Sequence, residues 1–336
     1  MKKINIITFL LLAVCLLSCQ KNKFEHVDLS NIRTNFVFQN FDSDLFALDS
    51  IGDSDIRKLQ SQYPGILPLF TTEVIRIGYP EDKGVIGLLN SFVNDTTMRA
   101  TKSLVDERIN KEQLKEQLDK AFKYYHHYFP DKTIPKVFTC ISGFNQSIVM
   151  TDSLLGIGVD KYLGRDCPYY PRLGISNYQQ MNMYPQKILS DAIYAWSTVQ
   201  FPFVGYGHQL IDKMIYEGKL QYMLEATLPE LADSVRIGFT QKQLDFCKKN
   251  EGDMWRYLAE NKMLFSTNRM DIIRYTGDAP YTSSFSAESP GRTGCWLGWQ
   301  IVKSYMEHNP DVTLAQLMAD KKTKLILNNS AYQAKS

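Results

Sequence analysis

The chain has 336 residues, of which 44% are hydrophobic and 12% aromatic, so it can bury a sizeable core as one large domain or two small ones. Its formal net charge is +2 and its basic residues form no stripe, which excludes the electrostatic footprint of a nucleic-acid-binding protein. We therefore expect no nucleic-acid partner.

The N-terminal segment has the parts of a bacterial export signal. Two lysines precede an apolar run over residues 4–17, and its last two leucines are followed by Ser18 and Cys19. A membrane-spanning helix would need a longer run, and an ordinary cleaved signal would end in an Ala-x-Ala-like site, which is absent here. The small residue before Cys19 is typical of a lipobox. We predict a lipoprotein signal peptide over residues 1–18, cleavage after Ser18 and acylation of the Cys19 thiol.

Acylation at this position would determine where the protein resides. One acyl chain binds a membrane only marginally, whereas the two or three chains of a bacterial lipoprotein hold a protein firmly. We expect residues 19–30 to form the lipidated N-terminus and a short tether, and residues 31–336 to form one globular domain. The anchor is compatible with either the inner or the outer membrane, with the body in the periplasm or at the cell surface.

The first part of the body combines one strand pattern with several helical patterns. Residues 35–44 alternate in part and indicate an early strand, whereas residues 70–77 and 85–93 have the apolar spacing of short helices. A long helix is predicted over residues 110–129, because Asn110 can cap it and apolar residues recur at three- and four-residue steps.

The middle of the chain is richer in β-forming residues. Residues 136–141 alternate, and residues 147–151 and 155–162 flank an Asp-Ser pair that is typical of a hairpin turn. From Pro185 onward the pattern is helical again, and a second long helix is predicted over residues 210–227. The expected class is α+β, mostly helical with a small central sheet.

The last third of the chain carries further helix signals. Capping boxes at Thr240 and Thr313 predict helices that begin just after them. Gly294 and Gly298, on either side of Trp296, indicate a helix that packs closely against a neighbour.

Four cysteines lie in the body of the chain, far apart and without a C-x-x-C pattern, which argues against a metal knuckle or a redox motif. Disulfides are allowed in the cell envelope, and four cysteines admit three pairings. A chain of this size does not depend on them, so we expect buried free thiols at Cys140, Cys167, Cys247 and Cys295.

Three longer segments resemble the signatures of a known family. They are residues 155–164 (Leu-Gly-Ile-Gly-Val-Asp-Lys-Tyr-Leu-Gly), residues 210–219 (Leu-Ile-Asp-Lys-Met-Ile-Tyr-Glu-Gly-Lys) and residues 289–302, which begin Ser-Pro-Gly-Arg-Thr-Gly-Cys-Trp. With the lipobox, their order and spacing are similar to those of the gliding-motility-associated lipoprotein GldB family, over most of the mature chain. The resemblance implies a component of the gliding-motility machinery and its associated secretion apparatus, with other envelope proteins as partners.

That family is in turn distantly similar to predicted zinc peptidases, which implies a zincin-like layout. In such a site an H-E-x-x-H helix supplies two ligands and a base, and the next helix supplies a glutamate ligand. Here the first helix reads Asp191, Ala192 and Ala195 at the matching positions, and only Glu217 is kept on the second helix. Because two ligands and the base are missing from these relict positions, we expect no metal, no cofactor and no catalysis.

Three alternatives remain open. Substitute ligands, such as Asp191, His208 and Glu217, would make the chain a divergent zinc-dependent hydrolase. A relict cleft could instead bind a small ligand. The segment before Thr293 could open a helix whose N-terminus attracts an anion together with Arg292, or Arg292 could pair with a local carboxylate.

Overall fold

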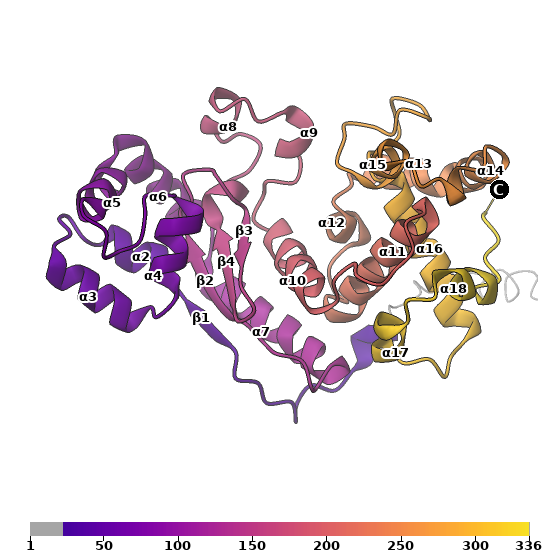
Figure 1. Ribbon diagram of the computed structural model, residues 1–336, viewed down its shortest axis with the longest axis horizontal. Coiled ribbons are helices and arrows are strands. Elements are labelled where there is room, and N and C mark those ends of the chain that lie inside the picture. The colour runs from indigo at the N-terminus through magenta and orange to yellow at the C-terminus, as the bar shows by residue number, and fades with distance from the viewer. Residues whose placement is uncertain (1–22, 336) are drawn as a thin grey trace, which may run out of the picture.

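The computed structural model describes residues 23–335, so the predicted signal peptide and the acylated Cys19 lie outside the described residues. The described chain is mostly helical with one four-stranded sheet, which confirms the predicted α+β class (Figure 1). No helix within residues 23–335 combines the length and the apolar character needed to cross a membrane.

The first hundred described residues form mainly helices. They are α2 (Phe41–Phe46), α3 (Asp53–Gln62), α4 (Ile66–Leu69), α5 (Val85–Asn94) and α6 (Thr96–Arg108), preceded by the 3-10 turn η1 (Lys23–His26). The helix predicted at residues 85–93 is confirmed as α5. The helix predicted over residues 70–77 is wrong in extent, because the chain forms only a π-type turn, η2 (Phe70–Val74), and leaves it at Arg76 in a left-handed conformation.

The strand predicted over residues 35–44 is also shorter than expected. Only β1 (Val37–Gln39) is extended, and α2 follows almost at once. The reason is the burial pattern, since Phe41, Leu45 and Phe46 lie on one buried face at helical spacing.

The sheet has the strand order β1-β2-β4-β3. Its other strands are β2 (Lys136–Cys140), β3 (Ile148–Met150) and β4 (Leu154–Gly158). β2 is parallel to both β1 and β4, whereas β3 and β4 form the predicted antiparallel hairpin, with Val149 opposite Gly156. The long helix α7 (Lys111–Tyr128) is confirmed, and its Asn110 cap accepts a 3.0 Å hydrogen bond from the backbone N–H of Gln113.

The chain turns sharply after β4, at the buried Asp160. The strand predicted to reach residue 162 ends at Gly158, and a 3-10 turn follows, η3 (Val159–Tyr162). The Asp160 carboxylate accepts hydrogen bonds from the backbone N–H groups of Ser142 and Phe144, at 2.8 and 2.5 Å, and from the Ser142 hydroxyl at 3.0 Å. Asp160 therefore fixes the loop that leaves β2.

Asp160 should make stability depend on pH. Burial raises the pKa of Asp160 from 3.8 to about 6, against the opposing effect of its hydrogen bonds. The folded state therefore binds this proton more tightly than the unfolded chain does. Protonated Asp160 adds to the free energy of unfolding below about pH 4, and this stabilisation is lost as the pH rises through 6. The stability of the wild type relative to Asp160→Asn should fall by about 3 kcal/mol over that window in urea titrations. A difference that does not vary with pH would contradict this prediction.

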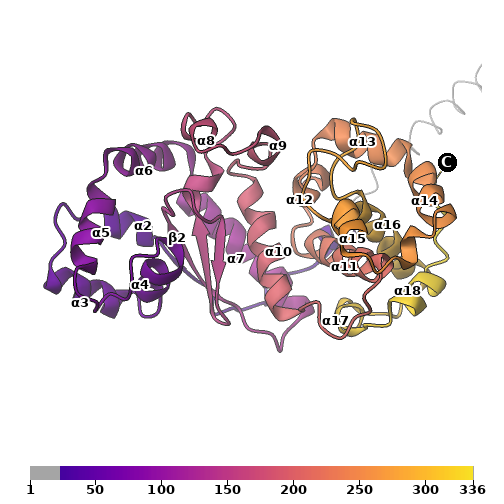
Figure 2. The ribbon, with the colours of Figure 1, turned by 45° about the horizontal axis from the view of Figure 1, so that its top comes forward.

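Within the described residues, the C-terminal half contains helices and loops but no strand. Its elements are α8 (Tyr169–Arg172), α9 (Asn177–Gln180), α10 (Lys187–Gln200), α11 (Leu210–Thr227), α12 (Asp233–Ile237), α13 (Gln241–Lys249), α14 (Glu251–Glu260), η4 (Met263–Phe265), α15 (Arg269–Thr276), α16 (Thr293–His308), α17 (Leu314–Ala319) and α18 (Thr323–Asn329). Both capping boxes are confirmed, with hydrogen bonds that open α13 and α17. In both views α10 stands between the sheet and helices α11 to α18 (Figures 1 and 2).

Helix α11 is the centre of this half. Every residue of α11 except Lys213 is buried. It packs against α16 through glycines on both sides, because a Cβ at Gly218 would lie 2.2 Å from the Gly298 carbonyl oxygen, and a Cβ at Gly298 would lie 1.8 Å from the Met214 carbonyl oxygen. The close packing predicted from Gly294 and Gly298 is therefore confirmed.

The four described cysteines are free and buried, as expected: Cys140, Cys167, Cys247 and Cys295.

Candidate functional site

A cavity of about 320 Å³ opens between α10 and α11, where the relict positions lie. Its lining combines side chains of α10, α11 and α12 with the end of α15 and the start of α16: Lys187, Asp191, Tyr194, Glu217, Gln221, Arg236, Thr276, Gly277, Asp278 and Arg292. The structure thus brings Asp191, Glu217 and Arg292 together in one cavity, which we call the α10–α11 cleft.

Each carboxylate oxygen of Asp191 has one donor within the protein. Its Oδ1 lies 2.7 Å from the Nζ of Lys187, one helical turn earlier on α10. Its Oδ2 accepts a 3.0 Å hydrogen bond from the hydroxyl of Tyr162 in η3. Burial raises the pKa of Tyr162 well above its usual range, with a further contribution from Asp191, so this hydroxyl keeps its proton and remains a donor.

Glu217 has the same arrangement on α11. Its Oε1 lies 2.7 Å from the Nζ of Lys213, again four residues earlier, and its Oε2 accepts a 2.8 Å hydrogen bond from the Tyr194 hydroxyl of α10. Burial, followed by the charge of Glu217, raises the pKa of Tyr194 well above its usual range. This hydrogen bond therefore links α10 to α11 within the lining of the cleft.

The remaining relict positions do not reach the cleft. Ala192 is buried in the core, and neither Ala192 nor Ala195 lines the cavity. His208 is exposed in the loop between α10 and α11 and also lies outside the cavity lining. Across residues 23–335 there is no group of three or more His, Cys, Asp or Glu side chains arranged to hold a metal ion.

Arg292 lies at the cap of α16, with a left-handed φ of 58°. Its guanidinium donates a 3.3 Å hydrogen bond to the Ile237 carbonyl oxygen, and its Nε lies 3.7 Å from Asp278. The side chain of Asp278 is 80% exposed, so this ion pair is screened by water. Arg292 therefore has a local carboxylate partner and also borders the cleft.

Two buried polar atoms of the cleft have no hydrogen-bond partner: Gln221 Oε1 and Arg236 Nε. Both residues are at least 95% buried. A buried polar atom without a partner lowers the stability of the folded state unless a water or a ligand supplies the missing hydrogen bond. Gln221 and Arg236 therefore bring one acceptor and one N–H donor without a partner to the lining of the cleft. The neighbouring Cys295 thiol is not reactive, because burial and then Glu217 raise its pKa to about 12.

The sequence identified the two carboxylates but not their partners. Lys187 and Lys213 each lie four residues before a relict carboxylate. This is the spacing of an ion pair on one face of a helix, so both pairs could have been predicted from the sequence. Gln221 follows Glu217 on α11 by the same four-residue spacing. No comparable signal marks Arg236, because α12 reaches the cleft only through the tertiary fold.

A family model described as gliding motility protein GldB matches residues 22–334. Comparison with the curated proteins and with the solved structures gives no match. The matched region contains both cleft helices and all three of the signature segments. Because it spans far more than half of the chain, the protein belongs to the gliding motility protein GldB family.

Proposed function

We propose that the protein is a lipid-anchored, non-catalytic component of the gliding-motility machinery and its associated secretion apparatus. Family membership associates the chain with gliding motility and, as a lipoprotein family, with the cell envelope. On this proposal Cys19 carries the anchor, and the body contacts other envelope proteins.

The observation that carries the non-catalytic role is that all four oxygens of the relict carboxylates have a donor within the protein. Zinc binds through lone pairs that are free to coordinate it. Both oxygens of Asp191 and both oxygens of Glu217 already accept from protein donors, and each carboxylate has an ammonium 2.7 Å away. That positive charge opposes a divalent cation, and no unpaired base is left to activate water.

The layout also suggests what replaced the metal. On the proposed descent from a zinc-peptidase-like ancestor, the hydrogen bond between Tyr194 and Glu217 joins the two helices that a zinc ion would have bridged. The helix pair would then be kept as a structural unit.

Replacing Glu217 with glutamine tests the proposal. We expect the purified wild-type protein to carry no stoichiometric zinc, and cells with Glu217→Gln to glide as the wild type does. Lys213→Gln is the matched control, since it breaks the same ion pair and leaves the carboxylate in place. Stoichiometric zinc in the wild type, lost together with a hydrolytic activity in Glu217→Gln but not in Lys213→Gln, would refute the non-catalytic role.

A second candidate function is favoured by the unpartnered atoms Gln221 Oε1 and Arg236 Nε. The cleft would then hold a small molecule with both donor and acceptor groups, and the protein would be a ligand-binding envelope lipoprotein. Native mass spectrometry on the sample used for metal analysis would reveal such a small molecule if it co-purifies with the protein.

A further inference from the structure

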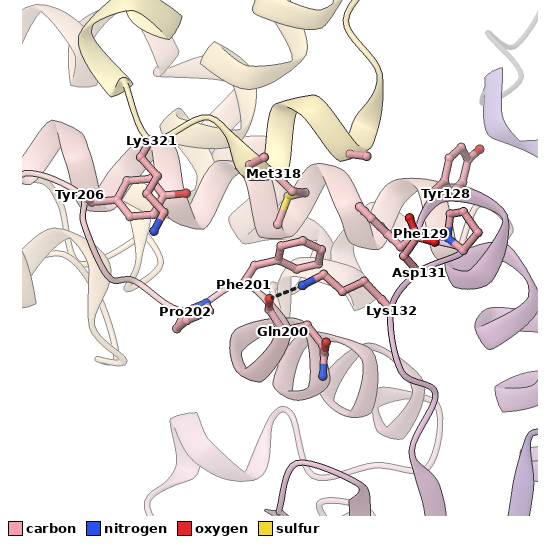
Figure 3. A pocket seen from close by; sticks show the side chains of 13 residues that line it. Tyr128, Phe129, Asp131, Lys132, Gln200, Phe201, Pro202, Tyr206, Met318 and Lys321 are labelled. Atoms are coloured by element: carbon pink, nitrogen blue, oxygen red, sulfur yellow. Dashed lines mark hydrogen bonds between the residues drawn. The ribbon is translucent and has the colours of Figure 1, made fainter.

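A second cavity, of about 430 Å³, lies away from the α10–α11 cleft (Figure 3). It is formed where α7 and α10 end and where α17 passes them, and we call it the α17 pocket. Its walls are largely apolar, with Phe129, Phe201, Pro202 and Met318 among the lining residues. The rings of Phe129 and Phe201 are in contact, with centroids 5.0 Å apart.

Two lysines flank this apolar surface in Figure 3. Lys132 donates to the Gln200 carbonyl oxygen at 3.3 Å, and its ammonium lies 4.9 Å from the centre of the Phe201 ring. Lys321 packs beside Gly205. Neither lysine takes part in an ion pair within residues 23–335. Asp131 is the single acidic side chain of the lining, so the pocket is net positive.

The pocket lies next to the place where the chain leaves the body toward its N-terminus. Tyr128 lines the pocket, and its ring contacts that of Phe24 edge-on, with centroids 6.0 Å apart. Phe24 comes five residues after Cys19, and five extended residues span at most about 18 Å. An anchor at Cys19 therefore holds this face close to the bilayer. Val204, in the loop beside the pocket, is 63% exposed.

We propose that the α17 pocket binds an acyl chain of an anionic phospholipid from the membrane that anchors the protein, with the phosphate against Lys132 and Lys321. The apolar walls suit the chain, and the two unpaired ammonium groups suit the phosphate. The acyl groups on Cys19 itself would fill the apolar part but leave both lysines without an anion. This assignment rests on the proposed lipid anchor.

Photo-cross-linking tests the assignment on the mature lipoprotein. The protein is placed in phosphatidylcholine nanodiscs that contain phosphatidylglycerol with a diazirine on its acyl chain, and cross-linked peptides are mapped by mass spectrometry. We expect cross-links to concentrate on residues 200–206 and 315–321. Ala319→Trp, at an exposed position on α17, should obstruct the pocket and lower their yield about tenfold, as expected when the burial of even two methylenes is lost.

The controls separate the pocket from the membrane surface in general. Leu173→Trp places the same side chain at an exposed position after α8 and should leave the yield unchanged. Lys132→Gln with Lys321→Gln should abolish the preference for phosphatidylglycerol over a phosphatidylcholine probe. Cross-links spread evenly over the surface, or insensitive to Ala319→Trp, would overturn the assignment. Pocket occupancy by the protein's own acyl groups would do so as well.

A separate measurement shows whether the proposed acylation of Cys19 fails. The mass of the peptide that begins at Cys19 reports acylation directly. If that peptide is unmodified, the anchor proposal fails. The full chain with Cys19→Ser, bound to phosphatidylglycerol vesicles with the same probe, then tests the pocket alone: cross-links at residues 200–206 and 315–321 support it, and their absence refutes it.

Discussion

Replacing Gly298 with alanine is expected to lower the free energy of unfolding by about 3 kcal/mol or more. The added Cβ would lie 1.8 Å from the Met214 carbonyl oxygen and 2.5 Å from the Met214 carbonyl carbon. These are backbone atoms of a buried helix, so no side-chain rotation relieves the overlap, and α11 and α16 must move apart. Urea unfolding followed by circular dichroism measures the loss.

Gly87 provides the matched control, because it also lies within a helix. A Cβ at Gly87 in α5 would meet nothing within 4 Å. Gly87→Ala should therefore raise the free energy of unfolding by about 0.5 to 1 kcal/mol, through the better helix propensity of alanine. Equal stability of Gly298→Ala and Gly87→Ala would show that α11 and α16 are not held in backbone contact.

Replacing Cys19 with alanine is expected to abolish acyl labelling and to release the protein from the membrane into soluble fractions. The physical reason is that two or three acyl chains supply the whole of the proposed attachment, at about 0.8 kcal/mol for each buried methylene. Metabolic labelling with a fatty acid, followed by fractionation of the cells, measures both effects together.

Cys15 is the control for this experiment. It lies in the same apolar run, but the residue before it is Val14, which is too large for the cleavage position of a lipobox. Cys15→Ala should therefore keep both label and membrane association. A Cys19→Ala protein that also keeps both would show that Cys19 is not the anchor.

How far the fold could be predicted depended on how strongly each segment separates apolar from polar residues. Helix α7 has a clear apolar stripe and a capping asparagine, and it was found to within a residue or two. Helices α3 and α6 were missed because they are mostly polar, and each buries only two of its side chains. The Asp95 side chain, which accepts from the N–H groups of Thr97 and Met98, was a capping signal that could have identified α6.

The candidate site was less predictable than the helices that carry it. Asp191 and Glu217 were identified because the resemblance to zinc peptidases points to one position on each of two helices. Their donors Tyr162 and Tyr194 come from other elements, and local patterns say nothing about which elements meet. The α17 pocket illustrates the same limit, since it is made of the ends of two helices and one side of a third.

The contacts of Phe24 also determine how the protein would carry mechanical load. Its ring packs against Tyr128 of α7 and Tyr222 of α11, with centroid distances of 6.0 and 5.5 Å. From there the chain passes below α7 to β1, an edge strand of the sheet (Figure 1). A pull on the residues before Phe24 is therefore resisted first by two long helices, one of them the most enclosed in the structure. The pulling force reaches the sheet only after the contacts of Phe24 with Tyr128 and Tyr222 break.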